Sequence, residues 1–115
     1  MTSLDNRVIL ITGAAGGIGS AVARTAVAEG AKVIIHDVNA KAIDALAGEL
    51  GASTTAITAD LSDAASTAQL WVDALAIHGR VDVLVNNAGI YPPAPLESSL
   101  EDWIKVWDIS LAVNL

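Results

Sequence analysis

Glycines cluster near the start of the chain, in the segment VILITGAAGGIG from Val8 to Gly19. They stand at Gly13, Gly16, Gly17 and Gly19, and each removes a Cβ atom where a chain turns sharply or lets a ligand approach its backbone. Backbone N–H groups at the start of a following helix can bind a pyrophosphate there. The segment lacks the Lys-Ser/Thr ending of a P-loop, which argues against an ATPase. Glycine is common in any strand-to-helix turn, but together with the acid downstream we interpret this segment as a dinucleotide-binding turn.

An acidic residue, Asp37, closes the second apolar run, KVIIH. It lies about twenty residues past the glycines, where a dinucleotide-binding fold places a carboxylate that accepts a hydrogen bond from a ribose 2′-hydroxyl. A 2′-phosphate beside this carboxylate would need a basic neighbour, but the flanking residues are His36 and Val38. The two motifs therefore predict NAD as the cofactor and disfavour NADP. The simpler alternative is a solvated aspartate at the end of a strand.

The elements that must position these residues alternate along the chain. Apolar runs predict strands that begin at Val8 and that span residues 32–37, 54–59 and 81–85, with helices between them. Near-continuous apolar strands joined by helices are typical of a parallel sheet covered on both faces. With right-handed crossovers, we expect one domain over residues 1–115, an α/β, Rossmann-like doubly wound sheet in the order 3-2-1-4.

Helical spacing also predicts which side chains of the helices pack together. The face predicted for the first helix consists of Ile18, Ala21, Val22, Thr25 and Ala26. The face predicted for the third helix consists of Thr67, Leu70, Trp71, Ala74, Leu75 and His78. A last helix is expected from Ser98, where Ser98-x-x-Glu101 resembles a capping box.

The candidate binding residues all follow predicted strands. The glycine turn, Asp37, Asp60 and the NNAG segment from Asn86 to Gly89 each come directly after one. Because the carboxyl ends of parallel strands meet at one edge of a sheet, where open α/β sheets bind ligands, we expect these residues to lie around one site.

Together these motifs resemble the short-chain dehydrogenase/reductase family. The resemblance is carried by Thr12-Gly13-x-x-x-Gly17-x-Gly19, by Asp37, by Asp60 in TADLSD and by the NNAG segment. It implies NAD(H)-dependent hydride transfer between a nicotinamide and a small alcohol or carbonyl substrate. Methyltransferases also place a glycine turn and an acid after their first two strands, and the NNAG segment distinguishes the two classes.

The resemblance also implies roles for single residues. The amide of Ile18 would contact the pyrophosphate, and the carboxylate of Asp60 and the amide of Leu61 would contact the adenine. Asp60 has a competing interpretation as a helix cap, because Asp-Leu-Ser-Asp is typical of a helix start. The implied cofactor-binding residues are Gly13, Gly17, Ile18, Gly19, Asp37, Asp60, Leu61, Asn87, Ala88 and Gly89.

The family's catalytic pair, Tyr-x-x-x-Lys, is not among the 115 residues, because the one tyrosine, Tyr91, is followed by Pro95 where the lysine should be. The chain therefore resembles the N-terminal, cofactor-binding part of a family member, truncated relative to the family. The family's relay asparagine maps to Asn114 by the local sequence Val-Asn-Leu, or to Ser110 by the spacing from Trp103. The alternative function is a non-catalytic NAD-binding or interaction module.

Composition restricts the partners. The 13 acidic residues outnumber the six basic ones, and the net charge of −7 opposes binding to nucleic acid. The chain has no cysteine and no apolar run of the ~20 residues that span a membrane, so we expect a cytoplasmic location. His36 and His78 lack metal-ligand spacing, and no metal is expected. The apolar fourth strand, VDVLV, would leave an open parallel edge, which predicts a homo-oligomer, a partner chain or further sequence that covers the edge.

Overall fold

Four parallel strands form one sheet within residues 4–88, which are the residues that the computed structural model of the chain describes. The strands are β1 (Val8–Ile11), β2 (Lys32–Asp37), β3 (Thr54–Thr58) and β4 (Val83–Val85). Their order is β3-β2-β1-β4, and each pairing is parallel. This confirms the predicted α/β, Rossmann-like sheet and its strand order.

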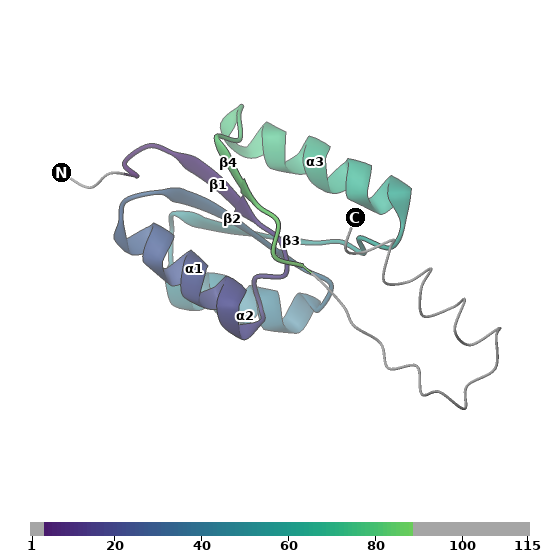
Figure 1. Cartoon of the computed structure of the whole chain (residues 1–115), viewed down its shortest axis with the longest axis horizontal. Coiled ribbons are helices and arrows are strands. Elements are labelled where there is room, and N and C mark those ends of the chain that lie inside the picture. Colours follow the sequence, from purple (N-terminus) through teal and green to yellow (C-terminus); the bar gives the residue numbers. More distant parts are fainter. Residues whose placement is uncertain (1–3, 89–115) are drawn as a thin grey trace.

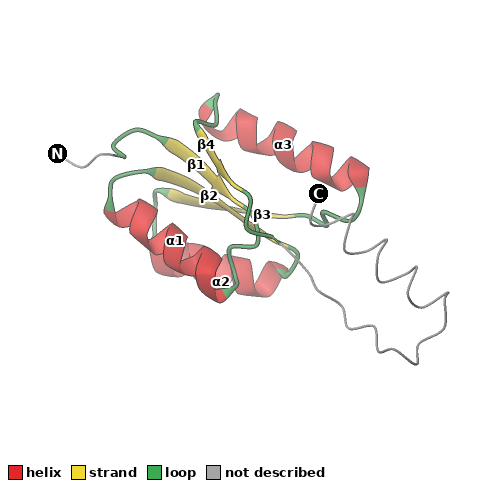
Figure 2. Cartoon of the chain, in the orientation of Figure 1, coloured by secondary structure: helices red, strands yellow, loops and turns green. Residues whose placement is uncertain are grey.

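Three helices connect the strands and cover both faces of the sheet. The helices α1 (Gly17–Ala28) and α2 (Ala40–Leu50) lie on one face, and α3 (Ala64–His78) lies on the other (Figure 1). Each helix follows a strand and runs back along the sheet before the next strand begins (Figure 2). All the strands therefore point their carboxyl ends the same way, and the strand-to-helix turns gather at one edge.

Two apolar layers separate the sheet from its helices. Successive side chains of a strand point to opposite faces, so Ile9 and Ile35 belong to the layer under α1 and α2. Leu10 and Ile34 belong to the layer that includes α3. Because both faces of β1 and β2 are covered, these strands appear in the sequence as continuous apolar runs and not as alternating ones.

Small residues form the face of α1 that packs on the sheet. Its buried residues are Gly19, Ala23 and Ala26, whose spacing places them on one side of the helix. The prediction of a bulkier face was therefore partly wrong. The residues of that predicted face that are exposed instead are Ile18, Ala21 and Thr25. Small side chains let α1 lie close to the strands, and this geometry leaves Ile18 75% exposed.

The face of α3 is narrower than predicted. Its buried residues are Leu70 and Ala74, which are one turn apart. Trp71 was expected on the same face but is 43% exposed, because the next residue of a helix is rotated by about 100°. The strand bounds differ slightly too: β3 ends at Thr58 and β4 begins at Val83, a difference that is usual at element ends.

Residues 1–3 and 89–115 lie outside the described part of the chain. The predictions for Gly89, Tyr91, Ser110 and Asn114, and for the helix expected from Ser98, fall on these residues. Within residues 4–88, none of the helices is long and apolar enough to cross a bilayer.

Candidate functional site

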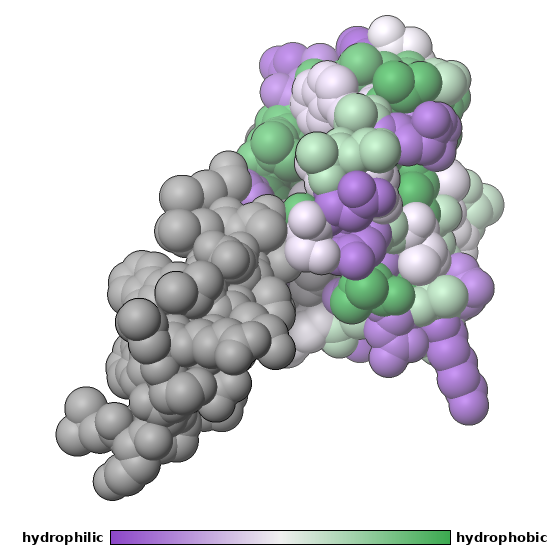
Figure 3. Space-filling model, turned by 90° about the vertical axis from the view of Figure 1, so that its right-hand side faces the viewer, coloured by the Kyte–Doolittle hydropathy of each residue, from purple (hydrophilic) through white to green (hydrophobic). Residues whose placement is uncertain are grey.

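A cavity of about 600 Å³ opens at the carboxyl ends of the strands. The glycine turn, the end of β2 and the segments after β3 and β4 all line it. Figure 3 looks onto the right-hand side of Figure 1, where hydrophobic and hydrophilic residues lie side by side on the described surface. The predicted binding residues that line the cavity are Gly13, Gly17, Ile18, Asp37, Asp60, Leu61, Asn87 and Ala88. The fold thus brings residues from four separate motifs to one place.

Two glycines of the turn are required by packing. Gly19 is buried and is not among the lining residues; a Cβ there would lie 2.6 Å from the carbonyl oxygen of Gly13 and 2.7 Å from Nδ2 of Asn87. Gly13 has a φ of +64°, and its Cβ would lie 2.8 Å from Cα of Ala88. A Cβ on Gly17, in contrast, would meet no atom within 4 Å. Gly17 therefore faces open space, where a ligand can approach the backbone.

The start of α1 differs from the starts of α2 and α3. Asn39 caps α2 by accepting a hydrogen bond from the Ala42 N–H at 3.1 Å, and Asp63 caps α3 by accepting one from the Ser66 N–H at 3.3 Å. The capping position of α1 is Gly16, which has no side chain to fill this role, and the first turn carries no acid. The N-terminus of α1, with its partial positive charge, therefore meets the cavity uncapped.

The carboxylate of Asp37 stands beside the glycine turn at the end of β2. Its Oδ2 accepts a hydrogen bond from the Ala15 N–H, and its Oδ1 accepts one from the Asn39 N–H, both at 3.1 Å. Each oxygen keeps a further lone pair, because carboxylate oxygens can accept two hydrogen bonds. The two amides fix the orientation of Asp37, which places a negative charge on the cavity wall. None of the described residues that line the cavity is a lysine or an arginine.

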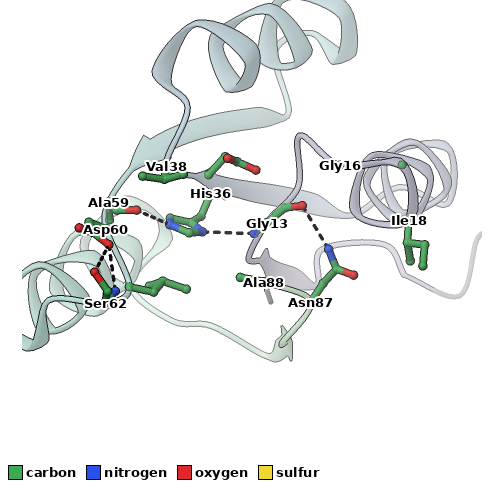
Figure 4. Close-up of a pocket in the computed structure, with 13 residues that line it drawn as sticks. Gly13, Gly16, Ile18, His36, Val38, Ala59, Asp60, Ser62, Asn87 and Ala88 are labelled. Carbon is green, nitrogen blue, oxygen red and sulfur yellow. Dashed lines mark hydrogen bonds between the residues drawn. The ribbon is translucent and has the colours of Figure 1, made fainter. Parts of the chain in front are cut away.

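Asp60 lies across the cavity from the start of α1 (Figure 4). Its Oδ1 accepts hydrogen bonds from the Ser62 hydroxyl at 2.6 Å and from the Ser62 N–H at 2.9 Å. These bonds hold the pKa of the Asp60 carboxyl below its usual value, because they favour the charged form. The carboxylate is therefore ionised and oriented. The alternative interpretation of Asp60 as the cap of the next helix is wrong, since Asp63 fills that position.

Thr12 joins the glycine turn to the segment after β4. Its hydroxyl accepts hydrogen bonds from the Asn87 and Ala88 N–H groups, each at 3.1 Å, and donates one to the Val85 carbonyl at 3.4 Å. The Asn87 side chain in turn donates to the carbonyl of Gly13 at 3.1 Å. These bonds hold β1 and β4 together at their carboxyl ends, where the strand order of the sheet reverses.

Five lining residues were not among the implied cofactor-binding residues: Gly16, His36, Val38, Ala59 and Ser62. Ser62 could have been found, because a serine two residues after an aspartate is typical of a side-chain turn. His36 gives no such signal, since its partners are backbone atoms of Gly13 and Ala59, each 23 positions away in the sequence. Among residues 4–88, no group of three His, Cys, Asp or Glu side chains is placed to hold a metal ion.

The sequence is similar to those of a known protein family. The profile described as short chain dehydrogenase matches residues 7–115. The chain is 45% identical over 117 aligned residues to the D-threitol dehydrogenase of Mycolicibacterium smegmatis, an alignment that covers 97% of this chain and 43% of that protein. It is 39% identical to the galactitol 2-dehydrogenase of Agrobacterium fabrum, with 94% and 43% covered. The chain thus spans less than half the length of these relatives.

Solved structures agree with the sequence comparison. The 3-ketoacyl-(acyl-carrier-protein) reductase of Brucella melitensis, complexed with NADH, matches with a TM-score of 0.82 and 34% identity over 97% of this chain and 48% of its own. A short chain dehydrogenase from Mycobacterium smegmatis matches with a TM-score of 0.84 and 32% identity over 99% and 51%. This chain therefore corresponds to about half of each solved chain.

Proposed function

The chain belongs to the short-chain dehydrogenase family, and from this premise we propose that it forms the cofactor-binding part of an NAD(H)-dependent oxidoreductase. One observation carries the proposal: an uncapped helix start and a fixed carboxylate, Asp37, line the same cavity. The first attracts a pyrophosphate and the second accepts hydrogen bonds from ribose hydroxyls. The diphosphate and the ribose of an adenosine diphosphate group therefore have complementary partners here.

The residues present fit a dinucleotide. Gly17 lines the cavity and has no Cβ, and a Cβ there would meet no atom within 4 Å. The backbone at the start of α1 is therefore accessible from the cavity. Val38 lies on the side of the cavity that holds Asp60 (Figure 4). Leu61 directly follows Asp60 in the sequence and also lines the cavity, so both residues offer apolar contacts. The Oδ1 atom of Asp60 is engaged by Ser62, and its Oδ2 is left to accept a hydrogen bond from an adenine amino group. When bound, the nicotinamide supplies the hydride-accepting carbon.

Charge favours NAD over NADP. The Asp37 carboxylate on the cavity wall would repel the 2′-phosphate of NADP, and the described lining residues supply no basic side chain that would offset the repulsion. A ribose with a free 2′-hydroxyl instead donates a hydrogen bond to the same carboxylate. The proposal therefore assigns the cofactor preference to Asp37.

Calorimetric titration of the purified chain with NADH and NADPH tests this assignment. We expect NADH to bind at least about tenfold more tightly, the difference that one charge-assisted hydrogen bond provides. Asp37→Asn removes the charge and should bring the two dissociation constants closer together. Asp44→Asn, a control on an exposed position of α2, should leave both unchanged. Equal binding of NADH and NADPH by the unaltered chain would refute the preference, and no binding of either would refute the function.

Catalysis in this proposal takes place in a longer polypeptide. The 115 residues do not contain the family's Tyr-x-x-x-Lys pair, and the chain covers 43% of the D-threitol dehydrogenase it resembles. We place the substrate among small alcohols and ketones, because relatives at 45% and 39% identity are named as dehydrogenases of threitol and galactitol. Hydride transfer by a polypeptide that holds both these residues and the Tyr-Lys pair would support the assignment, and its absence with polyol and ketone substrates would contradict it.

The outer edge of β4 supports association. Within the described residues β4 pairs only with β1, and Val83 and Leu84 are 42% and 50% exposed. An unpaired apolar parallel edge favours contact with another strand. We therefore propose that the 11.7 kDa chain, when it is purified without the rest of a longer polypeptide, forms an oligomer or binds a partner chain through this edge. A stable monomer in dilute solution, measured by light scattering, would contradict this proposal.

A further inference from the structure

The imidazole of His36 lies between two of the segments that form the cavity. Figure 4 shows the ring between the glycine turn and the segment after β3, with one ring nitrogen facing each. The Gly13 N–H donates a hydrogen bond to Nδ1 at 3.3 Å, and Nε2 lies 2.8 Å from the Ala59 carbonyl oxygen. The side chain is 2% exposed. It is therefore a buried cross-link between segments that are not adjacent in the sequence.

The two partners fix the tautomer of this ring. A backbone N–H can only donate, so Nδ1 carries no proton; a carbonyl can only accept, so Nε2 carries it. The imidazole is neutral in this arrangement, and both of its nitrogens are satisfied. No hydrogen-bonding atom of the ring is left for a ligand, which means that His36 can influence binding only through Gly13 and Ala59.

We propose that His36 is a positioning residue that sets the distance between the pyrophosphate end and the adenosine end of the cavity. The inference rests on the proposed function. Gly13 belongs to the turn that leads to the start of α1, and Ala59 directly precedes Asp60. One ring nitrogen thus holds the phosphate-binding side and the other holds the adenine-binding side, while the backbone of His36 runs directly into Asp37.

Backbone hydrogen bonds also hold these segments together, independently of the His36 ring. Its carbonyl accepts a hydrogen bond from the Ala14 N–H at 2.8 Å, and the Asp37 carbonyl accepts one from the Ala59 N–H at 3.3 Å. These bonds tie the same segments together without the ring. A substitution of the His36 side chain therefore leaves these backbone hydrogen bonds in place. It removes only the additional hydrogen bonds that the ring makes to the glycine turn and to Ala59.

Two substitutions each keep one of the two ring contacts. In His36→Asn the side-chain oxygen occupies the place of Nδ1 and still accepts from Gly13, but it does not reach Ala59. In His36→Gln the amide nitrogen occupies the place of Nε2 and still donates to Ala59, but Gly13 loses its acceptor. The control is Asp82→Asn, at the opposite end of the sheet, where Asp82 accepts a hydrogen bond from the Val8 N–H at 2.8 Å.

The experiment measures dissociation constants for AMP, which occupies the adenosine end, and for ADP-ribose, which occupies both ends. His36→Asn should weaken both ligands by the same factor, about five- to tenfold, as the loss of one hydrogen bond predicts. His36→Gln should weaken ADP-ribose by a similar factor and leave AMP unchanged. Asp82→Asn should lower thermal stability and change neither constant.

The outcomes separate positioning from stability and from the function itself. If His36→Gln weakens AMP and ADP-ribose by equal factors, or if neither variant changes either dissociation constant, the positioning role is overturned while the proposed function stands. If the unaltered chain binds neither ligand nor NADH, the proposed function fails and this inference fails with it. If one variant does not fold, judged by far-UV circular dichroism, the other decides alone, because uniform weakening is expected only for Asn and selective weakening only for Gln.

Discussion

Replacing Gly19 by alanine tests whether close packing holds the glycine turn. The added Cβ would lie 2.6 Å from the carbonyl oxygen of Gly13, 2.7 Å from Nδ2 of Asn87 and 2.8 Å from Cα of Ala14. Two of these three are backbone atoms, so rotating a side chain cannot relieve all the contacts. The methyl group also meets the Asn87 nitrogen that donates to Gly13 at 3.1 Å.

The magnitude follows from three contributions. Overpacking of this kind costs about 1–3 kcal/mol, and loss of the hydrogen bond from Asn87 costs about 1 kcal/mol. Alanine returns about 1 kcal/mol through its higher helix propensity, because Gly19 lies inside α1. We therefore expect Gly19→Ala to lower the free energy of unfolding by about 1–3 kcal/mol.

Urea unfolding followed by circular dichroism measures this change, with two matched glycines as controls. A Cβ at Gly48 in α2 meets no atom within 4 Å, so Gly48→Ala should raise the free energy of unfolding by about 0.5–1 kcal/mol. A Cβ at Gly17 also meets no atom, but it enters the cavity; Gly17→Ala should keep the stability and weaken NADH binding.

The reasoning is refuted if Gly19→Ala unfolds at the same urea concentration as the unaltered chain, or if it is stabilised as Gly48→Ala is. Either result would mean that the turn has room for a methyl group and that its glycines serve only the ligand. Unchanged NADH binding in Gly17→Ala would show, separately, that the ligand does not approach α1 at this residue.

Other substitutions test the contacts around the sheet. Thr12→Val removes the hydroxyl that accepts hydrogen bonds from the Asn87 and Ala88 N–H groups at 3.1 Å, and it should lower the free energy of unfolding by about 1–3 kcal/mol. Thr12→Ser keeps the hydroxyl and should cost less, so equal losses in the two variants would contradict these hydrogen bonds. Asn39→Ala and Asp63→Ala each remove a helix cap and should lower the free energy of unfolding by about 1 kcal/mol. An unchanged melting temperature in either variant would contradict this expectation. The Val8 N–H and then Arg80 lower the pKa of Asp82, so its contribution to stability is present above the ordinary aspartate pKa of about 4 and is lost as the pH falls through the lowered value. Thermal melts from pH 6 to pH 2.5 should therefore converge for the unaltered chain and Asp82→Asn at the acid end, and a constant difference would refute the assignment.

The strands and the motif positions could be predicted because each depends on local sequence. β1 and β2 are buried on both faces and therefore appear as unbroken apolar runs, which fixed both their place and the parallel fold class. The glycine turn, Asp37 and Asp60 each follow such a run, so the carboxyl edge of the sheet follows as the place where they meet.

The sequence could not predict the features that depend on how closely helices and strands approach one another in the folded chain. Helical spacing identified bulky residues of α1 as its packed face, but the helix lies on Gly19, Ala23 and Ala26 because small residues allow a shorter distance to the sheet. The exposure of Ile18 and its place in the cavity wall follow from that choice. The role of His36 was hidden for a related reason, since its partners are backbone atoms that come near only in the folded chain.

The hydrogen bonds inside the glycine turn determine which amides remain for a ligand. The Gly13 N–H is used by His36 and the Ala15 N–H is used by Asp37. The first N–H groups of any α-helix have no acceptor within the helix, and α1 begins at Gly17 without a capping side chain. Polar side chains thus satisfy the turn and leave the start of α1 without a side-chain partner, which is the point where the pyrophosphate of the proposed cofactor would accept hydrogen bonds.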